Sequence, residues 1–227
     1  MMIQMRKLLI SIGLLLLSGL SLMAQEQEQV WAEFEQQLAS KSQQVQTIAC
    51  RFVQVRSLAV LASEVRKAGD FRYAHPERIL LQFDDGDYIR MDATTFRMQS
   101  AGHVTRTRIN ANPMLKELKR MLTACMTGDI RQITVGFDVA VTSDKSGYVM
   151  TLVPQRGRSA ARVSRMVLMF DKGDMTLKRL RMEQPSGDST EYQFMEKTLN
   201  EPIEEGLFAT EERCVWRGIF IKLRSGH

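Results

Sequence analysis

Few residues of this chain could do chemistry, and they do not form a known catalytic pattern. The 227 residues include three histidines and three cysteines, and no two cysteines form a Cys-x-x-Cys pair. The sequence contains no Gly-x-Ser-x-Gly, no His-Glu-x-x-His and no phosphate-binding P-loop, the motifs that place a nucleophile, a zinc ion or a nucleotide. We therefore expect a protein that is not an enzyme, with no catalytic residue, no metal and no cofactor.

The acidic residues Asp84, Asp85 and Asp87 are the densest group of potential metal ligands. They resemble a calcium-binding loop only weakly, because the ligand spacing and the closing glutamate of such a loop are missing. We interpret them as a solvated turn.

The three cysteines are Cys50, Cys125 and Cys214. An odd number leaves at least one without a partner in the chain. We interpret Cys50 and Cys125 as small buried hydrophobic residues rather than as a disulfide, while the redox state of all three stays open.

The composition is that of a globular protein. Hydrophobic residues make up 44% and charged residues 25% of the chain, which excludes bulk disorder, a collagen-like fibre and a multispan membrane protein. The net charge is +5, and the basic residues are scattered among acids, so we expect no nucleic-acid binding.

The N-terminal segment has the pattern of a secretory signal peptide. A basic stretch that ends at Lys7 precedes the apolar run Leu8 to Leu22, and Ser21 to Ala24 supplies a small-residue cleavage site. This predicts a signal peptide over residues 1–24 and a single domain over residues 25–227. No cysteine follows the apolar run, so we expect a soluble exported protein that is not itself lipidated.

Two segments have the spacing of amphipathic helices. Val30, Phe34 and Leu38 recur every four residues and predict a helix from about Glu28 to Val45. A second helix is predicted to begin at Pro113 and to end at Gly128. Its apolar face combines Met114, Leu115, Leu118, Met121, Leu122 and Cys125.

The rest of the chain alternates apolar and polar residues, as strands do. The predicted strands begin with Ile48 to Val53, Leu58 to Lys67, Gly69 to Tyr73, Ile79 to Phe83, Tyr88 to Met91 and Thr95 to Gln99. They continue with Ile133 to Thr142, Tyr148 to Pro154, Val163 to Asp171, Thr176 to Gln184 and Thr190 to Lys197. The connections are short, so neighbours should be antiparallel. Two helices and nine to eleven strands indicate a strongly curved sheet or an open barrel.

Three stretches together resemble a known family. They are Phe52-Val53-Gln54, the segment Gly69 to Pro76, and a longer series from Tyr148 to Phe208 that includes Val167 to Asp171 and Gly187 to Phe194. In order and spacing they are similar to the periplasmic outer-membrane lipoprotein carrier family, LolA, over about Val30 to Phe208.

The resemblance implies an α+β fold: an incomplete, strongly curved antiparallel β-barrel, or half-barrel, with helices forming a lid over an apolar cavity. It also implies a monomeric carrier that shields the acyl chains of lipoproteins. Such a carrier receives its cargo from an inner-membrane ABC release complex and passes it to an outer-membrane acceptor.

The resemblance also suggests site residues. The candidate cavity walls are Phe71, Tyr73, Ile79, Leu81 and Phe83, and the candidate inner face of the lid is Leu115, Leu118, Met121 and Leu122. Family members carry an arginine that latches the lid immediately before the strand-end proline. His75 occupies that position here, before Pro76, so the latch candidates are His75 and Arg72.

Other binding functions fit the same features. The changed latch position and a C-terminal segment that departs from the family after Phe208 leave room for a carrier of a free lipid, glycolipid or lipid-linked pigment. A lipid-sensing periplasmic regulator is a further alternative. Alternation along each strand does not say which face of the sheet is concave.

Overall fold

The computed structural model describes residues 27–60, 64–111, 113–155 and 163–208. The predicted signal peptide, Cys214 and the C-terminal departure from the family lie outside these residues. The backbone of Leu118 is described, whereas its side chain is not.

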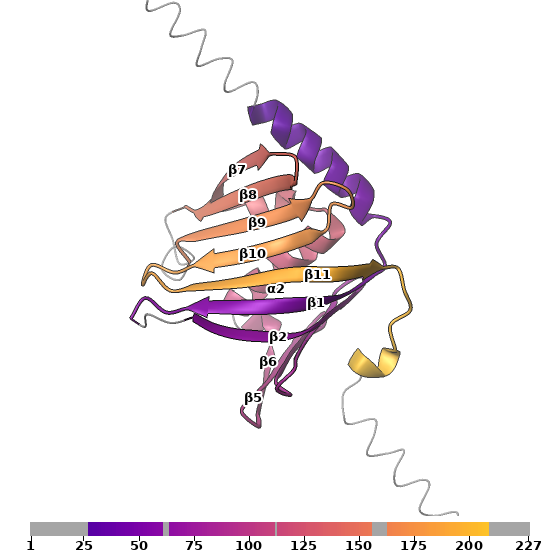
Figure 1. Cartoon of the computed structure of the whole chain (residues 1–227), viewed down its shortest axis with the longest axis vertical. Helices are drawn as coiled ribbons and strands as arrows, with labels where there is room; N and C mark the ends of the chain where they lie inside the picture. Colours follow the sequence, from indigo (N-terminus) through magenta and orange to yellow (C-terminus); the bar gives the residue numbers. More distant parts are fainter. Residues whose placement is uncertain (1–26, 61–63, 112, 156–162, 209–227) are drawn as a thin grey trace, which may run out of the picture. The chain divides into compact units, whose positions relative to one another are not determined.

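Eleven antiparallel strands form one sheet in the described part of the chain, in the order β6-β5-β4-β3-β2-β1-β11-β10-β9-β8-β7 (Figure 1). Their bounds are β1 Thr47–Ser57, β2 Glu64–Ala74, β3 Arg78–Phe83, β4 Tyr88–Met91, β5 Thr95–Ser100, β6 His103–Arg108, β7 Phe137–Ser143, β8 Gly147–Pro154, β9 Arg165–Asp171, β10 Leu177–Glu183 and β11 Ser189–Leu199. Because β6 and β7 end the order and do not pair with each other, the sheet is open. This confirms the predicted incomplete antiparallel barrel of the α+β class.

The helices are close to the predicted ones. The N-terminal helix is described over residues 27–42, and α2 covers Pro113–Thr127. A short helix, α3 (Arg131–Thr134), and two 3-10 turns, η1 (Ile109–Ala111) and η2 (Glu205–Phe208), complete the described elements.

Two predicted strand limits were wrong. The strand expected from Ile133 begins only at Phe137, because Ile130 and Ile133 are both buried at the three-residue spacing of α3. The strand expected over Leu58 to Lys67 is interrupted: β1 ends at Ser57, residues 59 and 60 form a turn, and β2 begins at Glu64.

Strand β6 was not predicted at all. Its sequence, His-Val-Thr-Arg-Thr-Arg, contains no buried residue. The strand lies at one end of the sheet order, and neither of its faces is packed into a core. It therefore lacks the apolar alternation by which a half-buried strand is recognised.

The described chain divides into two compact units. The first, here called the N-terminal-helix unit, contains residues 27–44, 54–66 and 120–193. The second, here called the β3–β6 unit, contains residues 45–53, 67–119 and 194–208.

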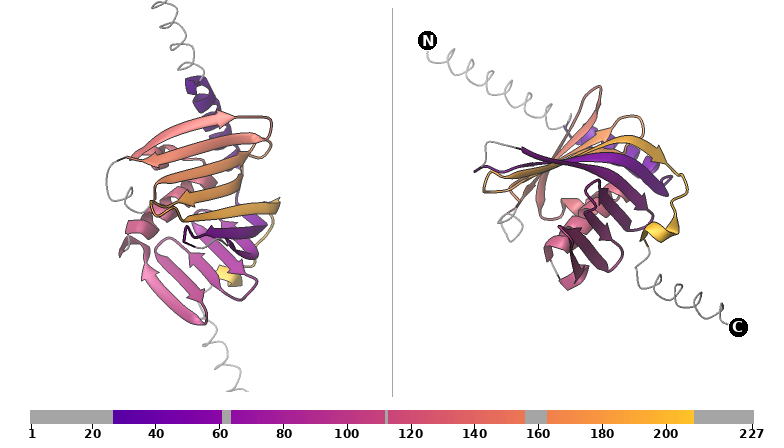
Figure 2. Two further views of the ribbon diagram at one scale, coloured as in Figure 1. Left: turned by 60° about the vertical axis from the view of Figure 1, so that its left-hand side comes forward. Right: turned by 60° about the horizontal axis from the view of Figure 1, so that its bottom comes forward.

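The N-terminal-helix unit packs its helix on the meander β7–β10, whose strands lie side by side (Figure 2). Phe34 is fully buried, and its ring centroid lies 5.2 Å from that of Tyr148 and 5.1 Å from that of Phe170. The Tyr148 hydroxyl donates a 2.7 Å hydrogen bond to Glu33 Oε1 on the helix. Aromatic packing and one polar contact therefore fix the helix on this meander.

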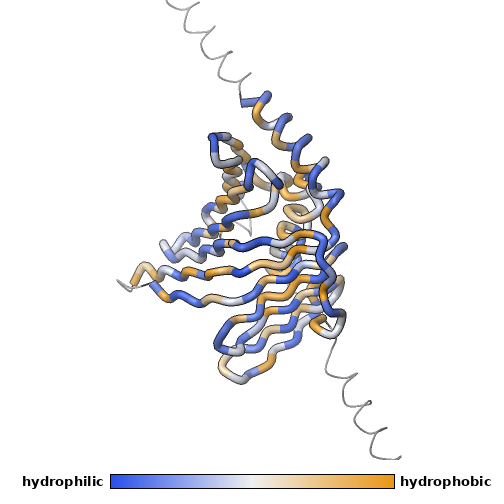
Figure 3. Tube along the Cα trace, turned by 45° about the vertical axis from the view of Figure 1, so that its right-hand side comes forward, coloured by the Kyte–Doolittle hydropathy of each residue, from blue (hydrophilic) through white to orange (hydrophobic). Residues whose placement is uncertain are grey.

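The β3–β6 unit is a run of hairpins with short turns. Strands β2 to β6 pair in chain order, each with the next. Hydrophobic and hydrophilic residues alternate along much of this unit, as the changing colour of the tube in Figure 3 shows. In β2 to β5 one side of each strand is therefore mainly apolar, whereas β6 is polar on both sides.

Candidate apolar binding face

The five predicted cavity residues lie on one face of β2 and β3. Phe71 is directly opposite Leu81, Tyr73 is opposite Ile79, and Phe83 is opposite Gly69. Residues directly opposite on neighbouring strands share a face. All five are buried. The register thus shows that the candidates on β2 and those on β3 share one face, which alternation along each strand alone did not establish.

The same face continues onto β4 and β5. Met91 lies opposite Ile79, and Phe96 lies opposite Met91; both are buried. The next row is more open, because Ile89 and Met98 are half-buried. On β6 the face ends in the hydroxyls of Thr105 and Thr107.

We call this surface the apolar face: Phe71, Tyr73, Ile79, Leu81, Phe83, Ile89, Met91, Phe96 and Met98. None of these nine side chains is charged, and the ammonium group of Lys67 lies 5.5 Å from the ring centroid of Phe83. Long hydrocarbon chains are suited to a surface of this kind, and methionine adapts to irregular shapes. Neither methionine of the face nor Phe96 or Ile89 was singled out from the sequence, although the alternation of β4 and β5 contained the signal.

Aromatic contacts tie the apolar face to β1 and β11. The ring centroids of Phe52 and Phe83 are 5.1 Å apart, as are those of Phe71 and Phe194. The hydroxyl of Tyr73 donates to the carbonyl of Pro76 at 3.3 Å, which gives the phenol a polar partner at the end of β2. Burial, aided by the nearby Glu77 carboxylate, raises the pKa of Tyr73 to about 12.

Three of the four predicted lid residues are buried. They are Leu115, Met121 and Leu122, and the side chain of Leu118 lies outside the described ones. Within the β3–β6 unit, the first half of α2 is held by Lys119. Its Nζ donates to Glu77 Oε2 at 2.6 Å and to the carbonyl of Ala93 at 2.7 Å.

The latch candidates make other contacts. His75 is exposed, and its backbone N–H donates to the carbonyl of Gln46 at 2.8 Å. Arg72 lies on the side of β2 opposite Phe71 and Tyr73. There its guanidinium lies 3.7 Å from Asp70 and donates a hydrogen bond to the backbone carbonyl of Phe71. The bond between α2 and the turn after β2 is made by Lys119, which was not among the latch candidates.

The remaining candidate groups are the cysteines and the acidic residues of the turn between β3 and β4. Cys50 and Cys125 are buried free thiols, and burial raises the pKa of each to about 12. Asp84 is bound by Arg51, and Lys67 bridges Asp85 and Asp87. Within the described ranges, no group of three or more His, Cys, Asp or Glu is arranged to hold a metal ion.

Two hollows are described, and both are lined by other residues. One, in the β3–β6 unit, is bordered by Thr94, Thr95 and β6. The other, in the N-terminal-helix unit, lies between Ala32 to Gln43 and Thr127 to Arg131. Among the described helices, none has the length and hydropathy to cross a membrane.

Comparison with known proteins supports the family resemblance. Residues 43–211 match the family described as outer membrane lipoprotein carrier protein LolA. The chain has no match among curated proteins.

Similar solved structures include a putative outer membrane lipoprotein-sorting protein domain from Vibrio parahaemolyticus, at 12% identity and a TM-score of 0.45 over 78% of this chain and 94% of that one. A LolA superfamily protein from Nitrosomonas europaea has 12% identity and a TM-score of 0.40 over 78% and 98%. The lipoprotein LppX from Mycobacterium tuberculosis has 10% identity and a TM-score of 0.43 over 76% and 96%.

The family match takes in well over half of the 227 residues. The chain therefore belongs to the outer membrane lipoprotein carrier protein (LolA) family.

Proposed function

We propose that this chain is a periplasmic carrier that shields the acyl chains of lipoproteins and ferries them from the inner to the outer membrane. Residues 1–24 act as a cleaved signal peptide, and residues 25–227 form the carrier domain. The observation that carries the proposal is the apolar face, which the strand register assembles in a member of this family.

The physical need for a carrier is clear. Each methylene group removed from water contributes about 0.8 kcal/mol, so long acyl chains do not leave a membrane for water unaided. The apolar face offers aromatic, branched and methionine side chains, without a buried charge that would oppose a hydrocarbon. Because carriage also requires release, an adaptable surface with Met91 and Met98 suits the task better than a rigid one.

The helix α2 acts in this proposal as a lid. Leu115, Leu118, Met121 and Leu122 form its inner side, and Phe71, Tyr73, Ile79, Leu81 and Phe83 form the wall of the cavity. Lys119 holds the first half of α2 to Glu77 and Ala93 and so acts as a latch, with His75 and Arg72 as further candidates at the same strand end.

Transfer from the inner to the outer membrane requires a partner at each membrane. An inner-membrane ABC release complex hands over the acylated lipoprotein, and an outer-membrane acceptor receives it. The carrier works as a monomer between them, with neither cofactor nor metal.

The test is whether the exported protein keeps a triacylated lipoprotein in solution without detergent. After ultracentrifugation, the lipoprotein should stay in the supernatant with the carrier. Met98→Glu places a charge on the half-buried part of the apolar face and should lower the soluble fraction several-fold. Val104→Glu is the matched control, because Val104 is exposed and lies on the other face, opposite Gln99. Sedimentation of the lipoprotein with wild-type carrier would refute the proposal.

Native mass spectrometry of the exported protein from its own host separates the general from the specialised carrier. A mass increment of an acylated lipoprotein supports the general role. An increment of a free lipid, glycolipid or pigment would instead assign the apolar face to that cargo.

A further inference from the structure

Strand β7 ends the sheet within the N-terminal-helix unit (Figure 1). It pairs with β8 along all seven of its residues, Phe137 to Ser143, without a register shift. In the described part of the chain, no strand pairs with its other side. An edge strand of this kind offers a row of backbone N–H and C=O groups to which another strand can bind.

The hydrogen bonds at the two ends of the β7–β8 hairpin show which backbone groups point outward. Asp144 N donates to the carbonyl of Gly147 at 3.0 Å, and Gln155 N donates to the carbonyl of Gly136 at 2.9 Å. In an antiparallel pair, every second residue exchanges hydrogen bonds with the neighbouring strand. The even-numbered residues of β7 therefore bond to β8. The odd-numbered ones direct their backbone groups away from β8, and no described residue is hydrogen-bonded to these groups: Phe137, Val139, Val141 and Ser143.

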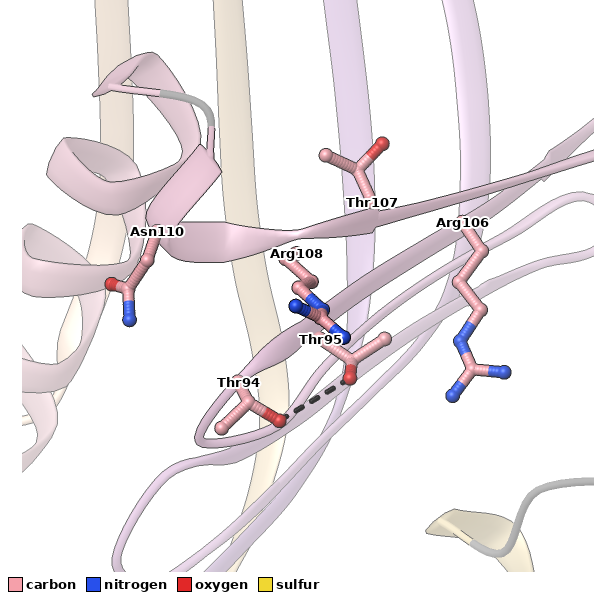
Figure 4. A pocket seen from close by; sticks show the side chains of 6 residues that line it. All are labelled: Thr94, Thr95, Arg106, Thr107, Arg108 and Asn110. Carbon is pink, nitrogen blue, oxygen red and sulfur yellow. Dashed lines mark hydrogen bonds between the residues drawn. The ribbon is translucent and has the colours of Figure 1, made fainter.

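The composition of β7 is unusual for an edge strand. Exposed edges are commonly protected by basic residues, proline or a bulge, and β7 has none of these; its one charged residue is Asp138. The other end of the sheet differs, because β6 carries Arg106 and Arg108, which project from the same side of the strand (Figure 4). Even the internal strand β10 is more highly charged than β7. The outer edge of β7 thus lacks the usual protection against pairing.

We propose that the outer edge of β7 pairs with the same edge of a second copy of this chain, antiparallel and about a two-fold axis at Ala140. The axis brings Val139 opposite Val141 of the second copy, and Phe137 opposite Ser143. Outward backbone groups then meet outward backbone groups, and about eight hydrogen bonds form across the axis. The two-fold arrangement is also the commonest one in protein assemblies.

The side chains of β7 favour this register. Asp138 lies opposite Thr142 of the second copy, so no like charges meet. An axis at Val141 would instead place Asp138 opposite Asp144, and an axis at Asp138 would oppose the two Asp138 carboxylates; both arrangements are destabilising. On the other side of the sheet, the buried Val141 and the half-buried Val139 form two β-branched cross-strand pairs. The same seven residues therefore match themselves in hydrogen bonding and in charge, which is why we assign the edge to a second copy.

The pair should be weak and reversible. Two seven-residue strands that meet edge to edge bury less than the roughly 1,200 Å² at which stable protein interfaces begin, so we expect a dissociation constant in the micromolar range. Dilution then releases the monomer, the form in which the proposed function places the carrier between the membranes. The pairing goes beyond that function and does not exclude it.

Sedimentation velocity of the exported protein tests the proposal without cargo. From about 1 to about 200 µM, a range that brackets a micromolar dissociation constant, the sedimentation coefficient should rise from that of a monomer to that of a dimer. Val139→Pro removes an outward N–H and leaves the hydrogen bonds to β8 in place. Because the two-fold axis repeats each contact, two hydrogen bonds are lost, and dimerisation should weaken about tenfold or more.

The matched control is Val104→Pro, which places proline on β6, the edge strand at the other end of the sheet. It should change dimerisation by less than about twofold. Val139→Ala keeps the backbone N–H and should weaken dimerisation less than Val139→Pro does. Circular dichroism of each variant checks that the fold is retained.

Ala140 supplies a second test that leaves the backbone unchanged. Because Ala140 lies on the two-fold axis, Ala140→Lys and Ala140→Glu each place like charges opposite each other, and each should weaken self-association by up to about fivefold. An equal mixture of the two variants places opposite charges at the axis and should dimerise at least as well as wild type. This test holds even if Val139→Pro fails to fold.

Several results would overturn the proposal. A protein that stays monomeric at the highest concentration has no such interface, and a dimer that Val139→Pro leaves unchanged has its interface elsewhere. Failure of the mixed Ala140 variants to recover dimerisation would refute the two-fold register. Slow hydrogen exchange of the Val139 and Val141 amides in a monomeric protein would show that another segment of the same chain covers the edge. None of these variants changes a residue of the apolar face, so this proposal and the carriage proposal can fail independently.

Discussion

Lys119 on α2 is joined to Glu77, in the turn between β2 and β3, by a 2.6 Å hydrogen bond from Nζ to Oε2. The side chain of Lys119 is only 13% exposed and that of Glu77 is 36% exposed. A partly buried pair of opposite charges is worth more than a fully exposed pair, because water screens it less. This contact, together with the bond to Ala93, sets how firmly the first half of α2 is held to the β3–β6 unit.

Replacing Lys119 with methionine should loosen α2. The variant keeps most of the side-chain volume but loses both hydrogen bonds, so we expect the free energy of unfolding to fall by about 1–2 kcal/mol. Hydrogen exchange of the α2 amides should accelerate more than that of the β3 amides. If α2 is the lid, loss of bound acyl cargo should also become faster.

The control for this prediction is Lys116→Met on the same helix, since Lys116 is exposed. It should leave both stability and exchange close to wild type. A double-mutant cycle with Glu77→Gln isolates the pair. A coupling energy near zero would show that the contact contributes nothing to holding α2.

The sequence allowed most of the fold to be predicted, but not the assembly of the apolar face. Alternation along β2 placed Phe71 and Tyr73 on one side, and alternation along β3 did the same for Ile79 and Leu81. Which side of β2 met which side of β3 depended on the register, and the register depends on the turn between them. Only the structure pairs Phe71 with Leu81.

The features that were missed have a common cause. Strand β6 and the side chain of Lys119 are polar, and hydrophobic periodicity does not predict the structure of polar segments. Lys119 meets its partner Glu77 across 42 residues of chain, a distance over which spacing rules do not operate. Likewise, Arg90, Arg97 and Arg106 lie opposite one another only once β4, β5 and β6 are in register.

Gly128 should be intolerant of a side chain. Its φ of +76° is a conformation that disfavours other residues, and an added Cβ would collide with Ser42 Oγ and lie 2.9 Å from the carbonyl of Leu38. Ser42 Oγ also donates a 2.7 Å hydrogen bond to the carbonyl of Thr127. Gly128→Ala should therefore cost about 1–2 kcal/mol for the backbone and more for the packing.

Gly102→Ala separates these two costs. Gly102 has a similar φ of +80°, and a Cβ there would meet no atom within 4 Å. Denaturant unfolding of both variants should show the larger loss for Gly128→Ala. Equal losses would mean that contact of residue 128 with the N-terminal helix does not matter.

Lys67 should control the ionisation of the turn between β3 and β4. Its Nζ lies 2.7 Å from Asp85 and 2.8 Å from Asp87, and these contacts lower the pKa of both carboxyl groups. Groups with a lowered pKa contribute stability that is present above their unfolded value and is lost as pH falls. Lys67→Gln should raise both pKa values toward the ordinary 3.8, as measured by carboxyl-carbon NMR titration. Unshifted titration curves would contradict the assigned role, and Lys116→Gln is the control.

At alkaline pH the fold should lose stability as buried groups are forced to ionise. Burial raises the pKa of the Cys125 thiol from 9.0 to about 12, so between these values the unfolded chain releases a proton that the folded chain keeps. Stability is then complete below pH 9 and falls as pH rises, by about 1.4 kcal/mol per pH unit for each such group. Cys50 acts in the same range, and Tyr73 and Tyr148 follow from pH 10.

Urea unfolding at pH 8, 9.5 and 10.5 should show this decline in the free energy of unfolding. In Cys125→Ala the decline should be shallower by one proton, and the stability at pH 8 should fall only through lost packing. An identical slope in the variant would mean that the folded protein lets the Cys125 thiol ionise as readily as the unfolded chain does.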